Sequence, residues 1–560
     1  MKIAKIKIHN FRGILDSTLD LFNYNLLVGP NNAGKSTVID AIRAFYEKDS
    51  FKFRTDRDFP FIPTQSKESW IEISFKLEPS EDAALADDYR NTDLVLKVRK
   101  YFKNEDKNKE GTIFGYKTDG TISNEPFYGA KNVQSGKFGD IIFIPAVSKV
   151  EEHTKLSGPS ALRDLLTKVL ENVVESSPSF KKFSGDFDEF AQNIKDEETE
   201  AGWSLGGLEA DLRALLSPWE SDIKIEMKSP SIGEIIKTML SYQCIDNAHG
   251  KALAAEQFGS GFQRHFIYSL IQIGSKYIGK KPSKKTKDFV PSMMLVLFEE
   301  PEAFLHPPQQ EVLARNLMTL SRKPDQQTIC STHSTYFVSR NTALIPSITR
   351  LKREKGLISV NQIGRNEWDE IVDANQTLNS IAIKWPKLKS KLEEDDLKPV
   401  MESVKYFLWL NPDRCGLFFA NHVLLVEGPS EQVLITKLLD DDKIKRPNCG
   451  LYVLDTIGKF NTHRFMNLLK ALGIQHSVIH DDDKNVDYHA EINQLIQDSK
   501  SQFTMIVKTI PNDLEDFLSV PKTKDHRKPQ HLLFLYESKV ISEDKLNLFC
   551  RMVESCLPNH

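Results

Sequence analysis

Hydrophobic and polar positions alternate along the first residues of the chain, as they do in β-strands that are buried on one face. The segment KIAKIKIHNF has this pattern, and a second apolar run ends at Val28. A loop rich in glycine follows, and from about Ser36 to Tyr46 the apolar positions take the spacing of a helix. The chain is therefore predicted to begin with two strands, a loop and a helix.

The rest of the chain divides into segments of different pattern. Short alternating runs from about 68 to 146 (WIEISFKLEP, DLVLKVRKYF, DIIFIPA) predict an antiparallel lobe. Residues 150–240 are amphipathic, which predicts a helical insertion whose apolar stripe suits self-association. We expect a mixed α/β protein with five parts: 1–149 and 241–369 as the two parts of one domain, 150–240 as the insertion, 370–420 as a helical connector, and 421–560 as a smaller α/β domain.

Length and composition limit the class of protein. A chain of 560 residues is too long for one hydrophobic core. Its 74 basic and 78 acidic residues give a net charge of -4, which excludes a strongly basic nucleic-acid coat but not a local basic patch. The six cysteines lack zinc-site spacing, and we find neither a signal peptide nor an apolar run of membrane-spanning length. We expect a soluble cytoplasmic protein with reduced thiols and no membrane contact.

The loop GPNNAGKST, residues 29–37, matches the phosphate-binding pattern G-x-x-x-x-G-K-[ST] between a strand and a helix. Its glycines let backbone N–H groups point at phosphate, and the helix N-terminus adds positive potential. Lys35 would reach the β- and γ-phosphates of ATP, and Ser36 would bind Mg²⁺. The predicted nucleotide residues of this loop are Gly29, Asn32, Gly34, Lys35, Ser36 and Thr37.

A second element of this site is MMLVLFEEPEAFLHP, in which an apolar strand ends in two acids. An acid at such a strand tip can hold the Mg²⁺ shell, and its neighbour can orient the attacking water. We assign Glu299 to the metal and Glu300 to the water. In QTICSTHSTYF, His333 ends another strand, where it would sense the γ-phosphate.

Two carboxylates four positions apart follow the apolar strand HVLLV, in the segment HVLLVEGPSEQ. Glu427 ends the strand, and Glu431 lies at i, i+4 spacing, so both could face one point. A second apolar strand ends in HSVIHDDDK, where strand alternation would put Asp481 and Asp483 on the same side. Close carboxylates repel unless a cation lies between them, so these four acids predict a Mg²⁺ or Mn²⁺ site.

The first half of the chain resembles the ABC-type ATPase head of SMC, RecF and related DNA-processing proteins. The resemblance is carried by KIKIHNFRG, GPNNAGKST, EEPE and STHS. It implies that a signature segment from a second head closes the nucleotide site, and the candidate is QFGSGFQR, with Gly259, Ser260 and Gly261. This segment departs from the common leucine-serine-glycine-glycine-glutamine form. Action in trans would require at least a dimer.

The order E-G-x-x-E and then D-x-D resembles the Toprim fold of topoisomerases, primases and certain nucleases. The resemblance implies acid/base chemistry at phosphodiesters for Glu427 and metal binding by the aspartates. PNDLEDFL offers Asp513 and Glu515 for a second metal, and Lys528 in KTKDHRKPQ could stabilise charge on the phosphate. Two such ions would clamp the attacking and leaving oxygens.

An ATPase head followed by Toprim is the combination found in the overcoming-lysogenization-defect (OLD) nucleases. Within that family the sequence looks most similar to the nuclease subunits of Gabija-type antiphage systems. The resemblance covers nearly the whole chain and is weakest from 150 to 240. It implies metal-dependent DNA cleavage, assembly into a dimer or tetramer through the helical insertion, and often a UvrD-like helicase partner.

Two basic stretches could contact DNA phosphates. The stretch KTKDHRKPQ, with Lys522, Lys524, Arg527 and Lys528, lies beside the predicted metal site. The densest stretch is KYIGKKPSKKTKD, with Lys276, Lys280, Lys281, Lys284, Lys285 and Lys287.

Three function classes stay open on the sequence alone. A nucleotide-regulated, metal-dependent DNA endonuclease uses every motif. A RecF-like repair clamp without cleavage would leave the acidic site vestigial, and an RNA-cleaving toxin is possible because Toprim chemistry does not select the sugar. Primase or topoisomerase activity is disfavoured, because we see no zinc-ribbon cysteines and no additional domain for a nucleophilic tyrosine.

Overall fold

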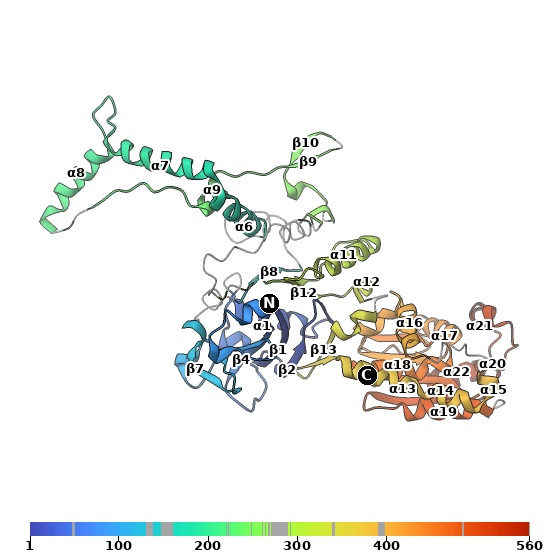
Figure 1. Ribbon diagram of the computed structural model, residues 1–560. Coiled ribbons are helices and arrows are strands. Elements are labelled where there is room, and N and C mark those ends of the chain that lie inside the picture. The colour runs from blue at the N-terminus through green and yellow to red at the C-terminus, as the bar shows by residue number, and fades with distance from the viewer. Residues whose placement is uncertain are drawn as a thin grey trace. The chain divides into compact units, whose positions relative to one another are not determined.

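The alternating N-terminal pattern forms strands, and the arrangement of these strands in the computed structural model is shown in Figure 1. The structure describes residues 1–47, 51–129, 138–146, 161–219, 221, 223–247, 249–259, 261–263, 265–266, 269, 289, 291, 293–338, 342–389, 398–483 and 487–558. The chain divides into two units, residues 1–146 with 285–560, and residues 147–284. The predicted insertion, 150–240, lies inside the second unit.

An antiparallel sheet in the order β2-β1-β4-β5-β6-β7 forms one layer of the first unit. The alternation of KIAKIKIHNF is visible in β1, where Ile3, Ile6 and Ile8 are buried and the intervening side chains are more exposed. The sequence predicted two strands before residue 30, and the structure has three, because a turn at Arg12 and Gly13, with Arg12 in a left-handed conformation (φ +52), leads the chain back into β2. The strands are β1 (Lys2–Phe11), β2 (Ile14–Asp20), β4 (Ser69–Lys76), β5 (Val95–Lys103), β6 (Ile113–Tyr116) and β7 (Ile122–Pro126).

A second, mostly parallel sheet carries the predicted nucleotide loop, in the order β14-β13-β3-β12-β11-β8. DIIFIPA was expected in the antiparallel lobe, and this is wrong: its strand β8 pairs in parallel with β11. The alternation of a short apolar strand does not reveal which sheet it joins. The strands are β3 (Tyr24–Val28), β8 (Asp140–Ile144), β11 (Met294–Glu299), β12 (Gln326–Ser331), β13 (Ile348–Glu354) and β14 (Leu357–Gln362).

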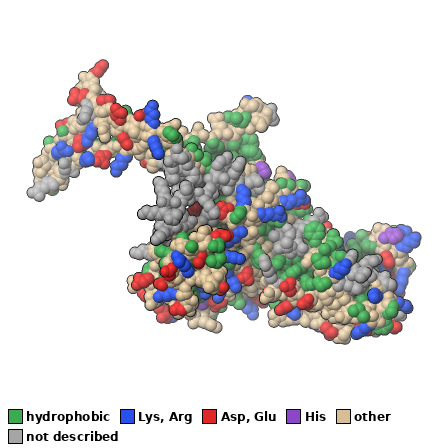
Figure 2. All heavy atoms as spheres, viewed as in Figure 1, with side chains coloured by type: hydrophobic (Ala, Val, Ile, Leu, Met, Phe, Trp, Pro, Cys, Tyr) green, Lys and Arg blue, Asp and Glu red, His purple; other side chains and the backbone are tan. Residues whose placement is uncertain are grey.

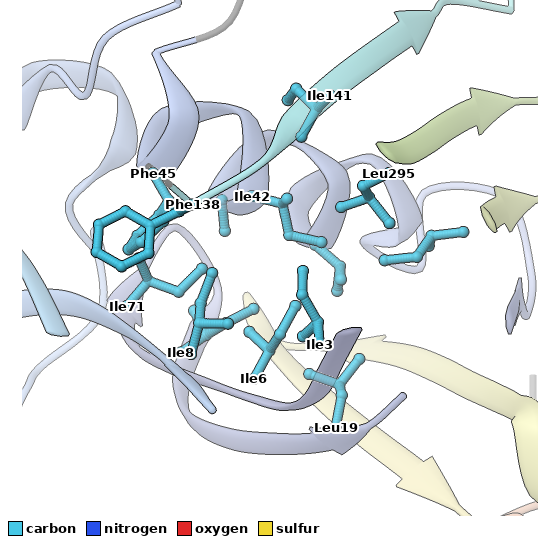
Figure 3. Packing of buried hydrophobic residues seen from close by; sticks show 14 of the residues in the cluster. Ile3, Ile6, Ile8, Leu19, Ile42, Phe45, Ile71, Phe138, Ile141 and Leu295 are labelled. Atoms are coloured by element: carbon cyan, nitrogen blue, oxygen red, sulfur yellow. The ribbon is translucent and has the colours of Figure 1, made fainter. Parts of the chain in front are cut away.

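Helix α1 (Lys35–Tyr46) shares one hydrophobic core with both sheets. Figure 3 shows Ile42 and Phe45 of this helix facing the isoleucines of β1, with Leu295 of β11 in the same cluster. Burying a side chain of this size contributes roughly 1.5–3 kcal/mol. The core therefore fixes α1, and with it the loop that precedes it.

Short elements complete this half of the unit. They are α2 (Thr55–Asp58), α3 (Pro79–Asp82), η2 (Asp87–Tyr89), η3 (Lys107–Lys109), η4 (Phe127–Gly129), α11 (Pro307–Leu320), α12 (Thr335–Val338) and η7 (Thr342–Ser347). The expected connector is helical, as α13 (Arg365–Asn375), α14 (Thr377–Lys384), α15 (Pro386–Lys389), α16 (Pro399–Trp409) and η9 (Arg414–Phe419).

The C-terminal part is built on a four-stranded parallel sheet in the order β16-β15-β17-β18. The strands are β15 (His422–Val426), β16 (Leu451–Asp455), β17 (Gln475–Asp481) and β18 (Thr504–Ile510). The chain runs outward from β15 to β16 and then returns to β17 on the other side of β15. The switch point of this sheet therefore lies between β15 and β17, the position at which open α/β sheets usually bind ligands.

Helices cover this sheet, coloured orange to red in Figure 1. One hydrophobic core joins β15 and β17 to α17, α21 and α22 through residues such as Leu434, Leu535 and Phe549. The helices and turns are α17 (Pro429–Asp440), η10 (Lys459–Asn461), α18 (Thr462–Ala471), α19 (Asp487–Asp498), α20 (Leu514–Leu518), η11 (Asp525–Arg527), α21 (Lys528–Glu537) and α22 (Glu543–Glu554).

The second unit, considered by itself, is mainly helical. It contains α6 (Ala161–Ser176), α7 (Pro178–Asp196), α8 (Leu205–Leu216), η5 (Ser217–Trp219), α9 (Ile232–Thr238), the hairpin of β9 (Cys244–Asp246) and β10 (Lys251–Leu253), and η6 (Ala255–Gln257). Figure 2 shows acidic and basic side chains mixed along α7 and α8. Large apolar side chains are also exposed there, among them Trp203, Leu215 and Trp219.

Candidate functional site

The nucleotide loop has the backbone that its glycines predict. Gly29 (φ +137) and Gly34 (φ +100) both have left-handed conformations, and a Cβ at Gly29 would lie 2.2 Å from the carbonyl oxygen of Leu351. Gly34 is the N-cap of α1. The loop can therefore curl tightly against β13 only because glycine stands at residue 29.

Lys35 points back over the loop that precedes it. Its Nζ donates to the carbonyl oxygens of Gly29 and Pro30, at 3.0 and 2.9 Å. Burial lowers the pKa of Lys35 to about 8, against the opposing charges of Glu300 and Glu302. Among the other predicted residues of the loop, the Asn32 side chain accepts from Arg353, and the Thr37 N–H donates to the Gly34 carbonyl oxygen at 3.0 Å.

Of the two acids at the end of β11, Glu299 reaches the loop directly, and Glu300 acts on Lys35 through its charge. The Ser36 hydroxyl donates to Glu299, although burial still raises the pKa of this carboxyl above its ordinary value. Ser36 and Glu299 are thus together, at the position assigned to a metal ion. Glu300 follows with a left-handed backbone (φ +42), which turns it away from the strand.

His333 lies beside Glu300, with 3.4 Å between Nε2 and Oε1. Burial and the charge of Lys35 lower the pKa of His333. Its backbone N–H donates to Glu302 Oε1 at 2.6 Å, so Glu302 fixes the position of this turn. Sequence reasoning missed Glu302, although it is the last acid of the quoted EEPE stretch.

The predicted signature segment lies in the other unit of the chain. Gly259 and Gly261 are described, and residues 261–263 are helical. Ser260 lies outside the described residues, as does the lysine-rich stretch from Lys276 to Lys287.

The two glutamates predicted for the second site lie around the end of β15. Glu427 directly follows the buried strand, and the N-terminus of α17 begins two residues later. Glu431 accepts from the backbone N–H of Gly428 at 2.9 Å, so it caps this helix as well as facing the site. Burial, followed by the charges of Glu427 and Glu515, raises the pKa of Glu431 to about 7.

Asp481, at the end of β17, meets Glu427 directly. Its backbone N–H donates to Glu427 Oε2 at 3.2 Å. Burial and then the charge of Glu427 hold the pKa of the Asp481 carboxyl well above its usual value, and burial does the same to Glu427. The adjacency of β15 and β17 thus brings the two predicted acids together at the switch point of the sheet.

Asp483 reaches this site by a route that strand alternation did not predict. Strand β17 ends at Asp481, and Asp483 has a left-handed backbone (φ +48), so the two aspartates do not share a side of a strand. Backbone bonds from Asp482 N–H to the Ile510 carbonyl oxygen and from Asp483 N–H to that of Asn512 hold the turn, at 2.9 and 3.0 Å. The expectation of shared alternation is therefore wrong.

Two basic side chains that sequence reasoning missed, Lys459 and His489, lie at this turn. Lys459 Nζ donates to the Asp481 carbonyl oxygen at 2.6 Å and to Asp483 Oδ2 at 3.1 Å. His489 Nδ1 lies 3.2 Å from the same carboxylate oxygen. Burial alone would raise the pKa of Asp483, but His489 and Lys459 hold it at about 2. In the sequence, Lys459 is distinguished only by the preceding Gly458, which indicates a turn, and by its position four residues after the end of β16.

The residues predicted for a second metal flank this cluster. Asp513 caps α20 and pairs with Lys522, which also contacts Asp516 at 3.0 Å. Glu515 is buried, and Lys528 Nζ lies 3.8 Å from its Oε1. The Lys528 side chain is 35% exposed, and Lys524 and Arg527 of the same stretch are exposed.

The donor set fits a hard divalent cation, because it consists of carboxylate oxygens with excess negative charge. Asp481 Oδ1 is buried and has no hydrogen-bond partner, which is the environment that a cation relieves. Among the described residues, no three His, Cys, Asp or Glu side chains already converge closely enough to hold an ion.

Direct contacts join the nucleotide half of the unit to this sheet. Arg350 of β13 is fully buried and donates to the carbonyl oxygens of Ala420 (2.8 Å), Gly473 (3.2 Å) and Leu472 (3.4 Å). The ring of His333 stacks on Phe419, with 6.2 Å between ring centroids. These contacts end at two places: Phe419 and Ala420 lie at the end of η9, before β15, and Leu472 and Gly473 lie between α18 and β17.

Comparison with known families agrees with the two halves of the site. The sequence matches the family described as AAA ATPase domain over residues 1–124 and 98–338. Residues 418–483 match the family described as Overcoming lysogenization defect protein-like, TOPRIM domain. These matches confirm the predicted combination of an ATPase head and a Toprim domain, and with it the resemblance to the OLD family.

Relatives of known name extend over most of the chain. The Old nuclease of Escherichia phage P2 is 24% identical over 86% of this chain and 77% of its own length. Endonuclease GajA of Bacillus cereus (strain VD045) is 23% identical over 86% of this chain and 75% of its own length.

Among solved structures, an SMC head bound to the C-terminal winged-helix domain of ScpA matches 66% of this chain and 99% of its own, with 11% identity and a TM-score of 0.37. In the part of the chain that the structure describes, no helix combines the length and the apolar character needed to cross a membrane.

Proposed function

Because this chain belongs to the AAA ATPase domain family and carries an OLD-like Toprim domain, we propose that it is a nucleotide-binding, divalent-metal-dependent endonuclease that cleaves or nicks DNA. The named relatives, an Old nuclease and an endonuclease GajA, support phosphodiester hydrolysis as the reaction. Antiphage defence is the biological role that the second of these names favours.

One observation carries the proposal. Glu427 and Asp481 meet at the carboxyl ends of two adjacent parallel strands, and both are half-buried, with pKa values that partial burial raises. Carboxylates kept so close without a matching cation reduce stability, so a structural role alone does not explain them. A site that binds a divalent ion does.

The residues have distinct roles in this proposal. Glu427, Glu431, Asp481 and Asp483 would hold one Mg²⁺ or Mn²⁺ ion, and Asp513 and Glu515 would hold a second. Bound there, such ions supply Lewis-acid activation of the scissile phosphate and of water. Glu427 also accepts or returns a proton, and Lys528, partly exposed at the edge of the cluster, would donate to the phosphate oxygen that gains charge.

The nucleotide site has its own set of roles. Lys35 would exchange its carbonyl partners on the loop for the phosphates of ATP, and Ser36 with Glu299 would hold the accompanying Mg²⁺. Glu300 would orient water, and His333 would sense the γ-phosphate beside it. Gly259, Ser260 and Gly261 of a second copy would close the site.

Assembly and partners follow from the same proposal. We infer a homodimer or tetramer formed through α6–α9, where large apolar side chains are exposed. A UvrD-like helicase is the partner that the Gabija resemblance favours. The described cysteines form no disulfide, which suits the cytoplasm.

The decisive experiment incubates the purified protein with supercoiled plasmid and, separately, with a structured RNA, in Mg²⁺, Mn²⁺ or EDTA. We expect nicked plasmid with either ion, intact plasmid in EDTA and intact RNA. Cleavage of RNA alone would indicate a ribonuclease, and cleavage of neither polymer would favour a repair clamp.

Two variants separate the sites. Glu427→Gln should abolish nicking and leave nucleotide binding unchanged, because the hydrogen bond of the Glu427 side chain within the described residues is to Asp481 and not to the loop of residues 29–37. Lys35→Ala should abolish nucleotide binding and leave Mn²⁺ binding at the acids intact. Parallel loss of both properties in either variant would indicate one composite site and would refute the division proposed here.

A further inference from the structure

A buried ammonium lies inside the acidic site, on a turn that joins β16 to α18. The Lys459 side chain is 2% exposed, and it belongs to the short helix η10. We propose that Lys459 is a positioning residue of the nuclease site: it is the resident counter-ion of the aspartate turn and sets how tightly the divalent ion binds. This inference rests on the proposed function, since it concerns the same site.

Lys459 joins the two ends of the aspartate turn. Its Nζ donates to the main-chain oxygen of Asp481 and to the side chain of Asp483, at 2.6 and 3.1 Å. Asp483 has a left-handed backbone, which an L-residue other than glycine adopts only when its surroundings hold it there. The ammonium therefore ties the Asp483 side chain to the main chain of Asp481, within a turn that backbone bonds to Ile510 and Asn512 also hold.

The position of Lys459 is fixed by the strand that carries Glu427. The N–H of Thr456 donates to the Val426 carbonyl oxygen at 2.9 Å, and the N–H of Gly458 donates to the Glu427 carbonyl oxygen at 2.8 Å. Gly458 has φ +95, a conformation in which a side chain would be strained. One turn thus determines where both Glu427 and Lys459 lie.

The acids around this ammonium differ in whether a basic side chain lies within ion-pair distance. Asp483 has Lys459 and His489 within 3.2 Å. Among the described residues, Glu427, Glu431 and Asp481 have no Lys, Arg or His within ion-pair distance. An entering divalent ion therefore meets three carboxyl groups that no ion pair neutralises, and next to them the positive charge of Lys459.

A solvated surface lysine or a phosphate-binding lysine would look different. Lys528 is such a residue, because it is 35% exposed and lies 3.8 Å from the nearest oxygen of Glu515. Lys459 is almost fully buried, and both of its partners are oxygens of the aspartate turn. Its role is exerted through the aspartates.

These contacts predict opposite effects on the metal-free and metal-bound protein. Removing the ammonium leaves the acids with less positive charge, which lowers the stability of the metal-free domain and strengthens the attraction for a divalent ion. In Lys459→Met, which keeps the apolar stem, we expect Mn²⁺ to bind about tenfold more tightly than in the wild type. Lys459→Arg keeps the charge and should bind Mn²⁺ with nearly wild-type affinity.

The test is a titration of the nucleotide-free, full-length protein with Mn²⁺ alone, followed by isothermal titration calorimetry and by the electron paramagnetic resonance signal of free Mn²⁺. Circular dichroism of each metal-free variant establishes that it is folded. If Lys459→Met does not fold, Lys459→Gln takes its place. Unchanged or weaker Mn²⁺ binding in the folded neutral variant would overturn the inference.

Failure of the inference is distinguishable from failure of the proposed function. Glu427→Gln removes one of the three carboxyl groups that no ion pair neutralises and should weaken Mn²⁺ binding at least tenfold. If Glu427→Gln weakens binding but Lys459→Met does not strengthen it, the metal site stands and the role of Lys459 is refuted. If neither substitution changes Mn²⁺ binding, the metal site itself is refuted.

Discussion

Arg350 offers the most informative single substitution, because it joins the strand beside the nucleotide loop to the Toprim sheet. In the pairing of β13 with β3, Arg350 lies opposite Val28, and Val28 immediately precedes Gly29 of the nucleotide loop. Its guanidinium is fully buried and faces carbonyl oxygens, with no ion pair among the described residues. Burial lowers the pKa of Arg350 to about 10. We consider Arg350→Met, which keeps much of the length and removes the charge.

The magnitude follows from two opposing contributions. The bonds at 2.8 and 3.2 Å are charge-assisted and contribute about 1.5–3 kcal/mol each, whereas the one at 3.4 Å contributes little. Their loss leaves buried carbonyl oxygens unsatisfied. Removing an unpaired buried cation returns part of its desolvation penalty. We therefore expect a net destabilisation of about 2–4 kcal/mol, confined to the contact between the two halves.

Hydrogen exchange measured by mass spectrometry is the appropriate assay, because a chain with several domains does not unfold in one step. Peptides covering Ala420 to Val426 and the end of α18 should exchange roughly 30- to 800-fold faster in Arg350→Met, the factor that corresponds to about 2–4 kcal/mol. In the plasmid assay, any effect of ATP on the nicking rate should be reduced, because the substitution weakens the contact that joins the strand beside the nucleotide loop to the Toprim sheet.

Lys352→Met is the matched control. Lys352 lies on the same strand, and it pairs with the exposed Glu354 at 3.2 Å. Such surface pairs contribute about 0–1 kcal/mol, so exchange in the Toprim peptides should not change. Equal exchange in Arg350→Met and the wild type would refute the reasoning, and so would an effect of ATP on nicking that is fully retained.

Two further predictions concern the backbone of the nucleotide loop and a buried ion pair. Gly29→Ala should abolish nucleotide binding and leave Mn²⁺ binding intact, because the added Cβ would lie 2.2 Å from the Leu351 carbonyl oxygen. Nucleotide affinity is measured by fluorescence titration, and a wild-type value would contradict the prediction. Burial alone would raise the pKa of Glu402, but hydrogen bonds from Arg464, at 2.8 Å, hold it below the ordinary value. This pair therefore adds stability above the unfolded pKa of Glu402, near 4.5, and that stability is lost as the pH falls through the lower folded value. Glu402→Gln should destabilise the protein by about 3–5 kcal/mol at pH 7. It should also reduce the loss of unfolding free energy at acid pH, measured by denaturant unfolding at a series of pH values. An equally steep loss in the variant and the wild type would exclude Glu402 as its source.

Local sequence patterns were sufficient to predict the nucleotide loop and to select most of the acids that the structure places at strand ends. The glycines of residues 29–37 dictate a left-handed turn before a helix, whatever the rest of the chain does. Glu299, Glu427 and Asp481 were found because apolar strands end in them, and the ends of parallel strands collect at one edge of a sheet.

The errors arose where a strand pattern was extended too far. Alternation predicts the side on which a residue lies only while the strand continues, and β17 stops at Asp481. Likewise, DIIFIPA has the composition of any short strand, so its sequence did not reveal that it joins β11 in the parallel sheet.

The sequence by itself determined the two chemistries of this protein, because each depends on residue types at fixed spacing within a strand, loop and helix. Only the tertiary structure decided which charges meet. Lys459 and Asp483 are 24 residues apart, and Arg350 reaches Gly473 across 123. No periodic pattern links such positions. Their contacts depend on strand order and on burial, and the electrostatic attraction between them acts only once the sheet has brought them within a few ångströms.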